Sequence, residues 1–225
     1  MEFLTKAEIR DFLILASVFA FLAAWHKWGV EEFNFLYGSG NYLISLIAMA
    51  FFLAAKFGAQ KLVANFLGIK VEQSVAPTPL ILAVLFVLLT NGKPTIAAAP
   101  LTLWAANKLK IEVAKKRLKK IAFKEVGLIA IAGPIANLLL AIILWPASKF
   151  FSTINIFLAL FALIPIPPFE GYQAFFTFRL IWAFAFGAIV FWAIFAALGI
   201  SSIIFALLGG ALGWFLFYFF VERKY

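Results

Sequence analysis

The chain has no cysteine and a single histidine, His26. The absence of cysteine excludes disulfides and thiolate metal ligands, and one histidine excludes a zinc site with two histidine ligands in one copy of the chain. Charge is also scarce, at 13% of 225 residues, whereas 65% are hydrophobic and the mean hydropathy is +1.05. This composition excludes an ordinary soluble domain and indicates a membrane protein.

Long apolar runs predict the membrane topology, because a helix needs about 20 apolar residues to cross the hydrocarbon core. We expect an all-α polytopic membrane protein, with one membrane-embedded domain over residues 1–225. No small-residue cleavage site follows the first run, so it is not interpreted as a signal peptide. The six expected transmembrane helices cover residues 12–25, 41–67, 126–145, 153–165, 174–196 and 201–221.

A different pattern separates the second and third expected spans. Residues 69–74 alternate apolar and polar side chains, which is typical of a strand, and residues 95–113 are also strand-like. Pro77 and Pro79 are expected to break the chain. Residues 80–90 are apolar but too short to cross a core of about 30 Å as a helix. We expect a re-entrant or interfacial hairpin with short β strands, and a full crossing by residues 80–90 stays open.

Basic residues are concentrated after this hairpin. Nine Lys and Arg but only two acids lie between residues 93 and 125 of a chain with net charge +9. The positive-inside rule then predicts that the loop over residues 92–126 and both termini are cytoplasmic. Residues 114–125 read as a basic amphipathic helix. We interpret residues 108–124 as a contact for anionic lipid headgroups, and we expect no nucleic-acid partner.

Two apolar segments carry residues that are costly inside a membrane. Residues 133–137 read Gly-Pro-Ile-Ala-Asn, and residues 162–171 read Ala-Leu-Ile-Pro-Ile-Pro-Pro-Phe-Glu-Gly. Proline removes a helix hydrogen bond, and an acid costs about 2.5–3.5 kcal/mol at the centre of a membrane helix. Such residues mark a candidate site, formed by Gly133, Pro134, Asn137, Pro165, Pro167, Glu170 and Gly171.

Together with residues 56–70, these segments resemble the site-2 protease family of intramembrane zinc metalloproteases, in its archaeal form. That family has H-E-x-x-H near the end of its second helix, then G-P-x-x-N, then N-x-I-P-x-P-P-x-D-G. The likeness covers about residues 6–175 in order and spacing, with a core over about 41–175. The C-terminal helices, residues 174–221, follow it.

The departures from the family decide the expected chemistry. The resemblance places Lys56 and Gln60 at the two zinc histidines, Phe57 at the general-base glutamate and Glu170 at the third zinc ligand, an aspartate. An ammonium group cannot bind zinc, an amide is a poor ligand and a phenyl ring cannot take a proton. We therefore expect no metal, no cofactor and no catalytic residue, although zinc is the family's cofactor. Ala162 replaces the asparagine that opens the last motif.

The resemblance implies a pseudoprotease of the cell membrane, which binds a transmembrane helix or a membrane-protein partner without cutting it. Two other functions stay open. An active metalloprotease could have a site rebuilt around Glu170, with metal supplied by carbonyl groups or a partner chain. A transporter or channel component would also place Lys56 and Glu170 inside the membrane, but the sequence has no internal repeat.

Three side chains allow two interpretations each. Lys56 either extends its ammonium group to the membrane surface or pairs with Glu170, replacing the charge of the metal. Gln60 either bonds within its own helix or hydrogen-bonds Glu170 or Asn137. Asn137, the family active-site residue that is retained, either joins two helices by a structural hydrogen bond or binds peptide.

Overall fold

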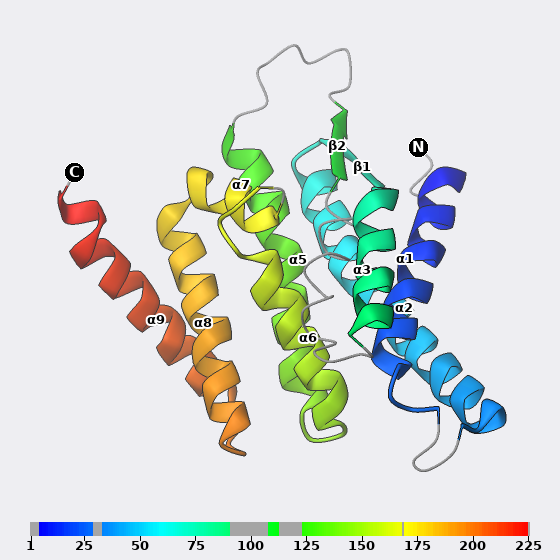
Figure 1. Cartoon of the computed structure of the whole chain (residues 1–225). Coiled ribbons are helices and arrows are strands. Elements are labelled where there is room, and N and C mark those ends of the chain that lie inside the picture. Colours follow the sequence, from blue (N-terminus) through cyan, green and yellow to red (C-terminus); the bar gives the residue numbers. More distant parts are fainter. Residues whose placement is uncertain (1–4, 29–32, 91–107, 113–122, 168, 225) are drawn as a thin grey trace. The chain divides into compact units, whose positions relative to one another are not determined.

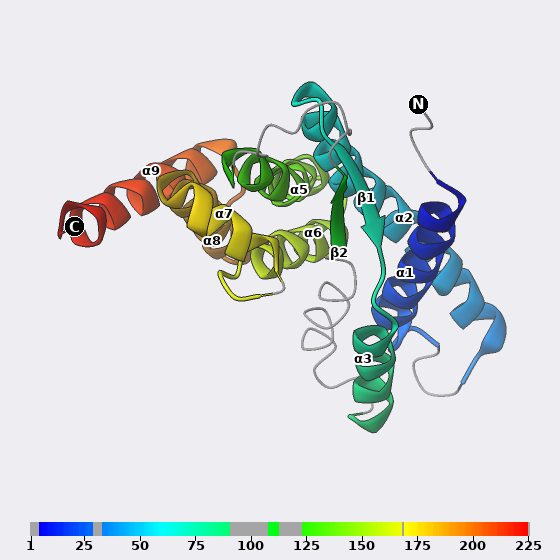
Figure 2. The same ribbon diagram turned by 90° about the horizontal axis from the view of Figure 1, so that it is seen from above.

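The computed structural model describes residues 5–28, 33–90, 108–112, 123–167 and 169–224. These residues are helical apart from loops and a two-stranded sheet (Figures 1 and 2). The α-helices are α1 (Lys6–Ala24), α2 (Phe35–Phe66), α3 (Pro77–Leu89), α5 (Phe123–Leu144), α6 (Lys149–Ala162), α7 (Glu170–Thr177), α8 (Arg179–Ala197) and α9 (Ile203–Phe220). The strands are β1 (Lys70–Ser74) and β2 (Lys108–Glu112), and a 3₁₀ helix covers Glu222–Lys224.

Four of these helices are long and apolar enough to cross a membrane, namely α2, α5, α8 and α9. The chain is therefore an all-α membrane protein at this coarser level. Helices α3 and α6 are apolar but shorter. Helix α1 carries Lys6, Glu8, Arg10 and Asp11 in its first two turns, so its apolar part covers only the later turns.

Two boundaries differ from the sequence-based expectation. The expected continuous helix over residues 174–196 is wrong, because α7 ends and α8 begins at Phe178, whose backbone has φ −139° and ψ 70°. Pro77 and Pro79 do not break the chain but lie in the first turn of α3. Proline is well tolerated there, since the first N–H groups of a helix have no partner within it.

The strand predicted for residues 69–74 is confirmed by β1, and α2 ends before Gly68, which has φ +72°. Of the strand-like residues 95–113, only β2 lies in the described part of the chain, where it pairs with β1 (Figure 2). The basic helix expected over residues 114–125 lies mostly outside the described residues; α5 begins at Phe123.

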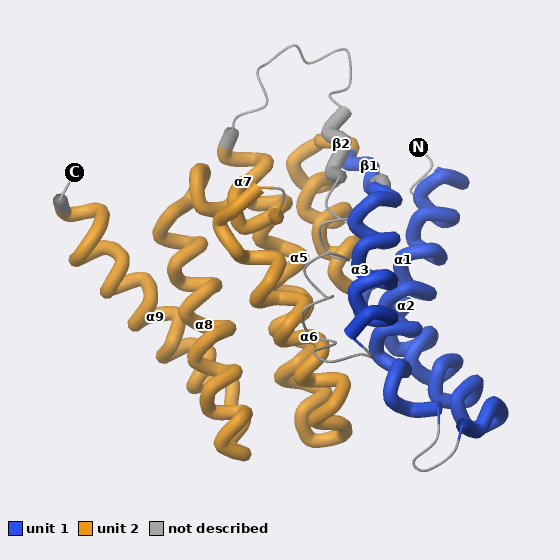
Figure 3. The backbone as a smooth tube through the Cα atoms, viewed as in Figure 1, with its two compact units in different colours: residues 1–54, 71–112 blue, residues 55–70, 113–225 orange. Residues whose placement is uncertain are grey.

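The chain divides into two compact units (Figure 3). The first comprises Met1–Ala54 and Val71–Glu112, and the second comprises Ala55–Lys70 and Val113–Tyr225. Helix α2 contributes residues to both units. The single membrane-embedded domain expected from the sequence stays a prediction.

In the first unit, α1 and α3 pack through Leu22, Ala83 and Val87. Two carboxylates of α1 also bind the backbone at the end of β1 and directly after it. Glu8 Oε1 accepts from the Gln73 N–H, and Asp11 Oδ2 accepts from the Val75 N–H, each at 3.1 Å. Residues three apart share one face of a helix, so these carboxylates hold the end of β1 and the residue that follows it against α1.

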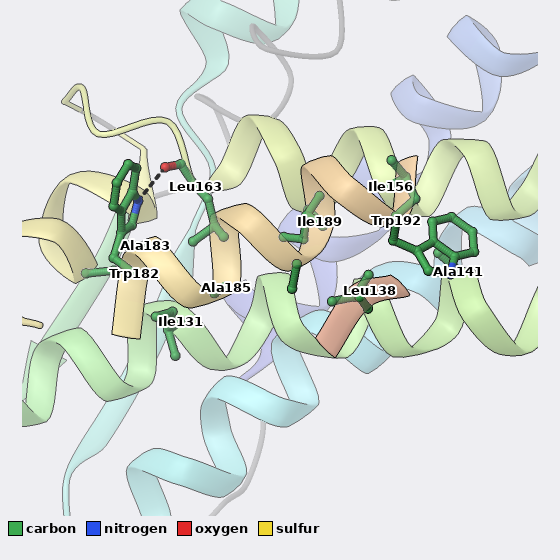
Figure 4. Packing of buried hydrophobic residues seen from close by; sticks show 14 of the residues in the cluster. Ile131, Leu138, Ala141, Ile156, Leu163, Trp182, Ala183, Ala185, Ile189 and Trp192 are labelled. Carbon is green, nitrogen blue, oxygen red and sulfur yellow. Dashed lines mark hydrogen bonds between the residues drawn. The ribbon is translucent and has the colours of Figure 1, made fainter. Parts of the chain in front are cut away.

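The second unit has a continuous apolar core formed by α5, α6, α8 and α9. Figure 4 shows Leu138 of α5, Ile156 of α6 and Ile189 of α8 in this core. Trp192 of α8 is also buried and meets the Trp145 ring edge-on, with centroids 5.6 Å apart. This core positions the ends of α6 and α7, which carry the candidate site.

The contact between α1 and residues 73–75 makes a testable prediction. Replacing Asp11 by Ala removes a charged acceptor and should lower the local opening free energy by about 1.5–3 kcal/mol. Hydrogen exchange at the Val75 amide should speed up accordingly. Arg10→Ala is the matched control, because Arg10 is 71% exposed and a surface ion pair contributes at most about 1 kcal/mol. Equal exchange in both variants would contradict a role for Asp11.

Candidate functional site

The candidate site joins the last turns of α2 to the start of α7, both within the second unit. Lys56 and Gln60 are four residues apart on α2, so their side chains leave the same face of the helix. Glu170 is the first residue of α7. All three side chains are buried, with Lys56 and Gln60 at 0% exposure and Glu170 at 2%.

Lys56 and Glu170 form a buried ion pair, with 2.9 Å between Lys56 Nζ and Glu170 Oε1. The pairing hypothesis is therefore confirmed, and the interpretation that Lys56 reaches the membrane surface is wrong. The two atoms are close, but Lys56 Nζ lacks the angle that a hydrogen bond to a described residue requires. The interaction is best described as Coulombic, which is strong because water is excluded from both groups.

Gln60 contacts the same carboxylate oxygen. Its Nε2 donates to Glu170 Oε1 at 2.8 Å, which confirms one of the partners considered for Gln60. The Lys56 ammonium group also lies 5.6 Å from the centre of the Phe57 ring, within the range of a cation–π interaction. Of the three α2 residues at the resembled family's H-E-x-x-H positions, Lys56 thus belongs to the charge pair, Gln60 contacts its carboxylate and Phe57 lies near its ammonium group.

The bend before α7 fixes Glu170 in place. Helix α6 ends at Ala162, and the indole Nε1 of Trp182 donates to the Leu163 carbonyl at 2.8 Å (Figure 4). This bond satisfies a carbonyl at a helix end that would otherwise lack a partner. A Cβ on Gly171 would collide with the backbone of Leu163. Gly171 therefore permits the start of α7 to lie directly against the end of α6.

Pro165 and Pro167 lie in this bend, half-buried and exposed respectively. They keep residues 163–169 from continuing α6, since proline cannot sustain a helix from its interior. Glu170 then lies at the N-terminus of α7, where the helix dipole favours a negative charge. The motif expected from the sequence therefore places its carboxylate at a helix start.

Helix α5 reaches the site through Gly133. A Cβ at Gly133 would lie 2.8 Å from Gln60 Nε2 and 3.0 Å from Lys56 Cγ, so a larger residue there would displace the two side chains of the site. Pro134 follows inside α5 and removes one backbone donor from the helix. Asn137 lies one turn beyond Gly133 on the same face and is fully buried.

Neither Asn137 Oδ1 nor Nδ2 has a hydrogen-bond partner among the described residues. The structural helix–helix bond considered for Asn137 is therefore not formed there, and Gln60 bonds Glu170 instead. Two site residues were not expected from the sequence. No sequence pattern near Trp182 predicts that it contacts the site. Gln173 lies three residues after Glu170 on α7, and this helical spacing could have identified it.

The residues at the expected metal position do not fit zinc. The ammonium group of Lys56 has no lone pair to donate, and it occupies the space beside the Glu170 carboxylate. Within the described ranges, no three His, Cys, Asp or Glu side chains are grouped so that they could hold a metal ion. We therefore derive no metal chemistry for this site.

Comparisons of the chain with family models, with curated proteins and with solved structures found no match. The resemblance to the site-2 protease family thus stays a prediction that depends on the motifs and their departures.

Removing one member of the ion pair should destabilise the protein. Lys56→Met leaves Glu170 buried without a cation and should lower the free energy of unfolding by about 3–5 kcal/mol. The double variant Lys56→Met/Glu170→Gln should recover much of this loss, because a neutral pair of similar volume avoids the buried charge. Denaturation in detergent micelles measures both. A single variant as stable as the wild type would refute the buried pair.

The close approach at Gly171 predicts a second stability effect. Gly171→Ala forces a methyl group into the Leu163 backbone and should cost about 1–3 kcal/mol. Gly58→Ala is the matched control, because a Cβ there meets nothing within 4 Å and alanine favours helix. Thermal denaturation should separate the two variants, and a tolerated alanine at 171 would mean that the bend is not constrained by this contact.

Proposed function

We propose that this protein is a catalytically inactive relative of the site-2 protease family, which binds a transmembrane helix of a client or partner without cutting it. One observation carries the proposal: Lys56 and Gln60 converge on one carboxylate oxygen of Glu170. In the resembled family, the same positions converge on zinc. Here the Lys56 ammonium group and the Gln60 amide occupy the place of the metal. The ammonium group balances the negative charge of Glu170.

The loss of hydrolysis follows from the side chains present. Peptide hydrolysis by this family needs a metal-bound water and a general base, because the metal lowers the pKa of that water. Phe57 stands at the general-base position and cannot accept a proton. Glu170 already accepts from Gln60 and pairs with Lys56. The site therefore lacks the groups for the reaction, while α2, α5 and α7 still bring its positions together.

A membrane arrangement finer than four apolar helices belongs to this proposal. We place α1 and α6 as two further spans, giving six, and the β1–α3 segment as a hairpin that dips into the membrane. Helix α6 has 14 residues and covers about 21 Å at 1.5 Å per residue, so the following bend would complete its crossing. Both termini and residues 92–126 are proposed to be cytoplasmic, with residues 108–124 near anionic lipid headgroups.

Zinc analysis tests the proposal. The wild-type protein should hold no zinc after dialysis, whereas Lys56→His/Gln60→His/Glu170→Asp should retain an equimolar amount, because three suitable ligands then converge on one point. Lys56→Leu/Gln60→Leu/Glu170→Asp is the control and should hold none. Equimolar zinc in the wild type would overturn the inactive site, and absence of zinc from the folded Lys56→His/Gln60→His/Glu170→Asp variant would count against the family resemblance.

A cleavage assay provides the second arm. The wild-type protein in lipid nanodiscs should bind a fluorescent transmembrane peptide and leave it intact. Peptide fragments that disappear with Glu170→Ala would instead establish an active protease with a rebuilt site.

A further inference from the structure

Three buried oxygen atoms near the ion pair lack a hydrogen-bond donor among the described residues. They are Glu170 Oε2, Gln173 Oε1 and Asn137 Oδ1. We call these acceptors, with Asn137 Nδ2, the polar cluster. Asn137 is fully buried and Glu170 is 2% exposed, so these groups are shielded from solvent. Their hydrogen-bonding capacity is unused within the described part of the chain.

The backbone places the cluster in one region of the second unit. Glu170 and Gln173 are three residues apart on α7, which puts them on neighbouring positions of one helix face. Asn137 lies one turn from Gly133, the α5 residue that faces Lys56 and Gln60. Helices α5 and α7 pack against each other. Asn137 therefore lies one turn of α5 from the residue that faces the ion pair, and Gln173 lies about one turn of α7 from Glu170, which belongs to it.

Buried polar atoms without a hydrogen-bond partner destabilise the folded protein. A buried acceptor without a donor loses its hydration and gains nothing in return, and inside a membrane no bulk water compensates for the loss. The donors that the site does contain are directed elsewhere: Gln60 Nε2 binds Oε1, and neither Lys56 Nζ nor Asn137 Nδ2 reaches the three oxygens. A donor brought by a bound partner would satisfy them.

The charges of the site restrict the chemistry of that partner. A carboxylate would face three acceptor oxygens and be repelled, whereas a second cation would lie next to the Lys56 ammonium group. A neutral donor meets neither obstacle. A primary amide matches best, because its N–H₂ group offers two donors to the oxygens while its carbonyl accepts from Asn137 Nδ2.

We infer that the client is a transmembrane helix with a side-chain amide, Asn or Gln, near its middle, and that the polar cluster recognises this amide. The inference depends on the proposed function, since it specifies which transmembrane helix is bound. Apolar contacts alone discriminate poorly in lipid, because lipid chains are as apolar as leucine. Polar recognition therefore supplies the selectivity.

The test uses the full-length wild-type protein in nanodiscs and a Leu/Ala host peptide that spans the bilayer. Its central residue is Asn, Leu, Asp or Lys, and binding is measured by fluorescence energy transfer. The Asn peptide should bind about tenfold more tightly than the Leu peptide, which corresponds to two or three membrane hydrogen bonds. The Asp and Lys peptides should bind more weakly than the Asn peptide.

Asn137→Leu and Gln173→Leu should each reduce the ratio of Asn-peptide to Leu-peptide affinity, because each removes a partner of the client amide. Gln173 is only half-buried, so its variant keeps the test valid if Asn137→Leu does not fold. Asn41→Leu is the control, because the Asn41 amide already donates to the Lys27 and Tyr37 carbonyls at 3.0 and 2.9 Å. It should keep the full preference.

The outcomes separate the two proposals. Equal binding of the Asn and Leu peptides overturns amide recognition and leaves helix binding in place. A preference for the Asp or Lys peptide also overturns it, because the charge argument would then be wrong. Absence of binding by every peptide contradicts both this inference and the proposed function.

Discussion

Charge neutrality at one buried position constrains the second unit of this protein. Glu170 lies at the start of α7 with almost no exposure, and a buried carboxylate is stable only when a cation compensates its charge. Lys56 supplies the countercharge from α2 at 2.9 Å, and Gln60 adds a hydrogen bond to the same oxygen. Because the partners come from segments more than 100 residues apart in sequence, the end of α2, the Gly133 face of α5 and the bend before α7 must assemble together.

The sequence predicted this site well where polar residues interrupt apolar runs. Lys56 and Gln60 show helical spacing in a segment with few other polar groups, so a partner for Glu170 had few candidates. The bend was equally visible, because Pro165 and Pro167 cannot continue a helix. The position of Trp182 could not be predicted, since its indole reaches Leu163 across 19 residues through tertiary packing.

Helix boundaries were predictable only where a local signal exists. Gly68 marks the end of α2 with a positive φ, and the alternation after it gave β1. The break at Phe178 carries no proline or glycine, and Phe178 still donates its N–H to the Ala174 carbonyl at 2.8 Å. Tertiary contacts therefore decide that α7 and α8 are separate helices. The number of spans is limited in the same way, because α1 has charged residues in its first turns and α6 has only 14 residues, whereas α2, α5, α8 and α9 are both long and apolar.

The shared oxygen of Glu170 also bears on how such a site changes over generations. Lys56 and Gln60 of α2 both contact one oxygen of Glu170 on α7. The effect of replacing any of these three residues therefore depends on which residues occupy the other two positions. Replacing Lys56 alone by a neutral residue leaves the Glu170 carboxylate without its cation, and replacing Glu170 alone by a neutral residue leaves the Lys56 ammonium group without its anion; each intermediate carries a buried, uncompensated charge. This coupling makes the positions strongly epistatic. A lineage that carries this pair would exchange it for another set of side chains only through less stable intermediates, so the three positions would tend to stay as they are.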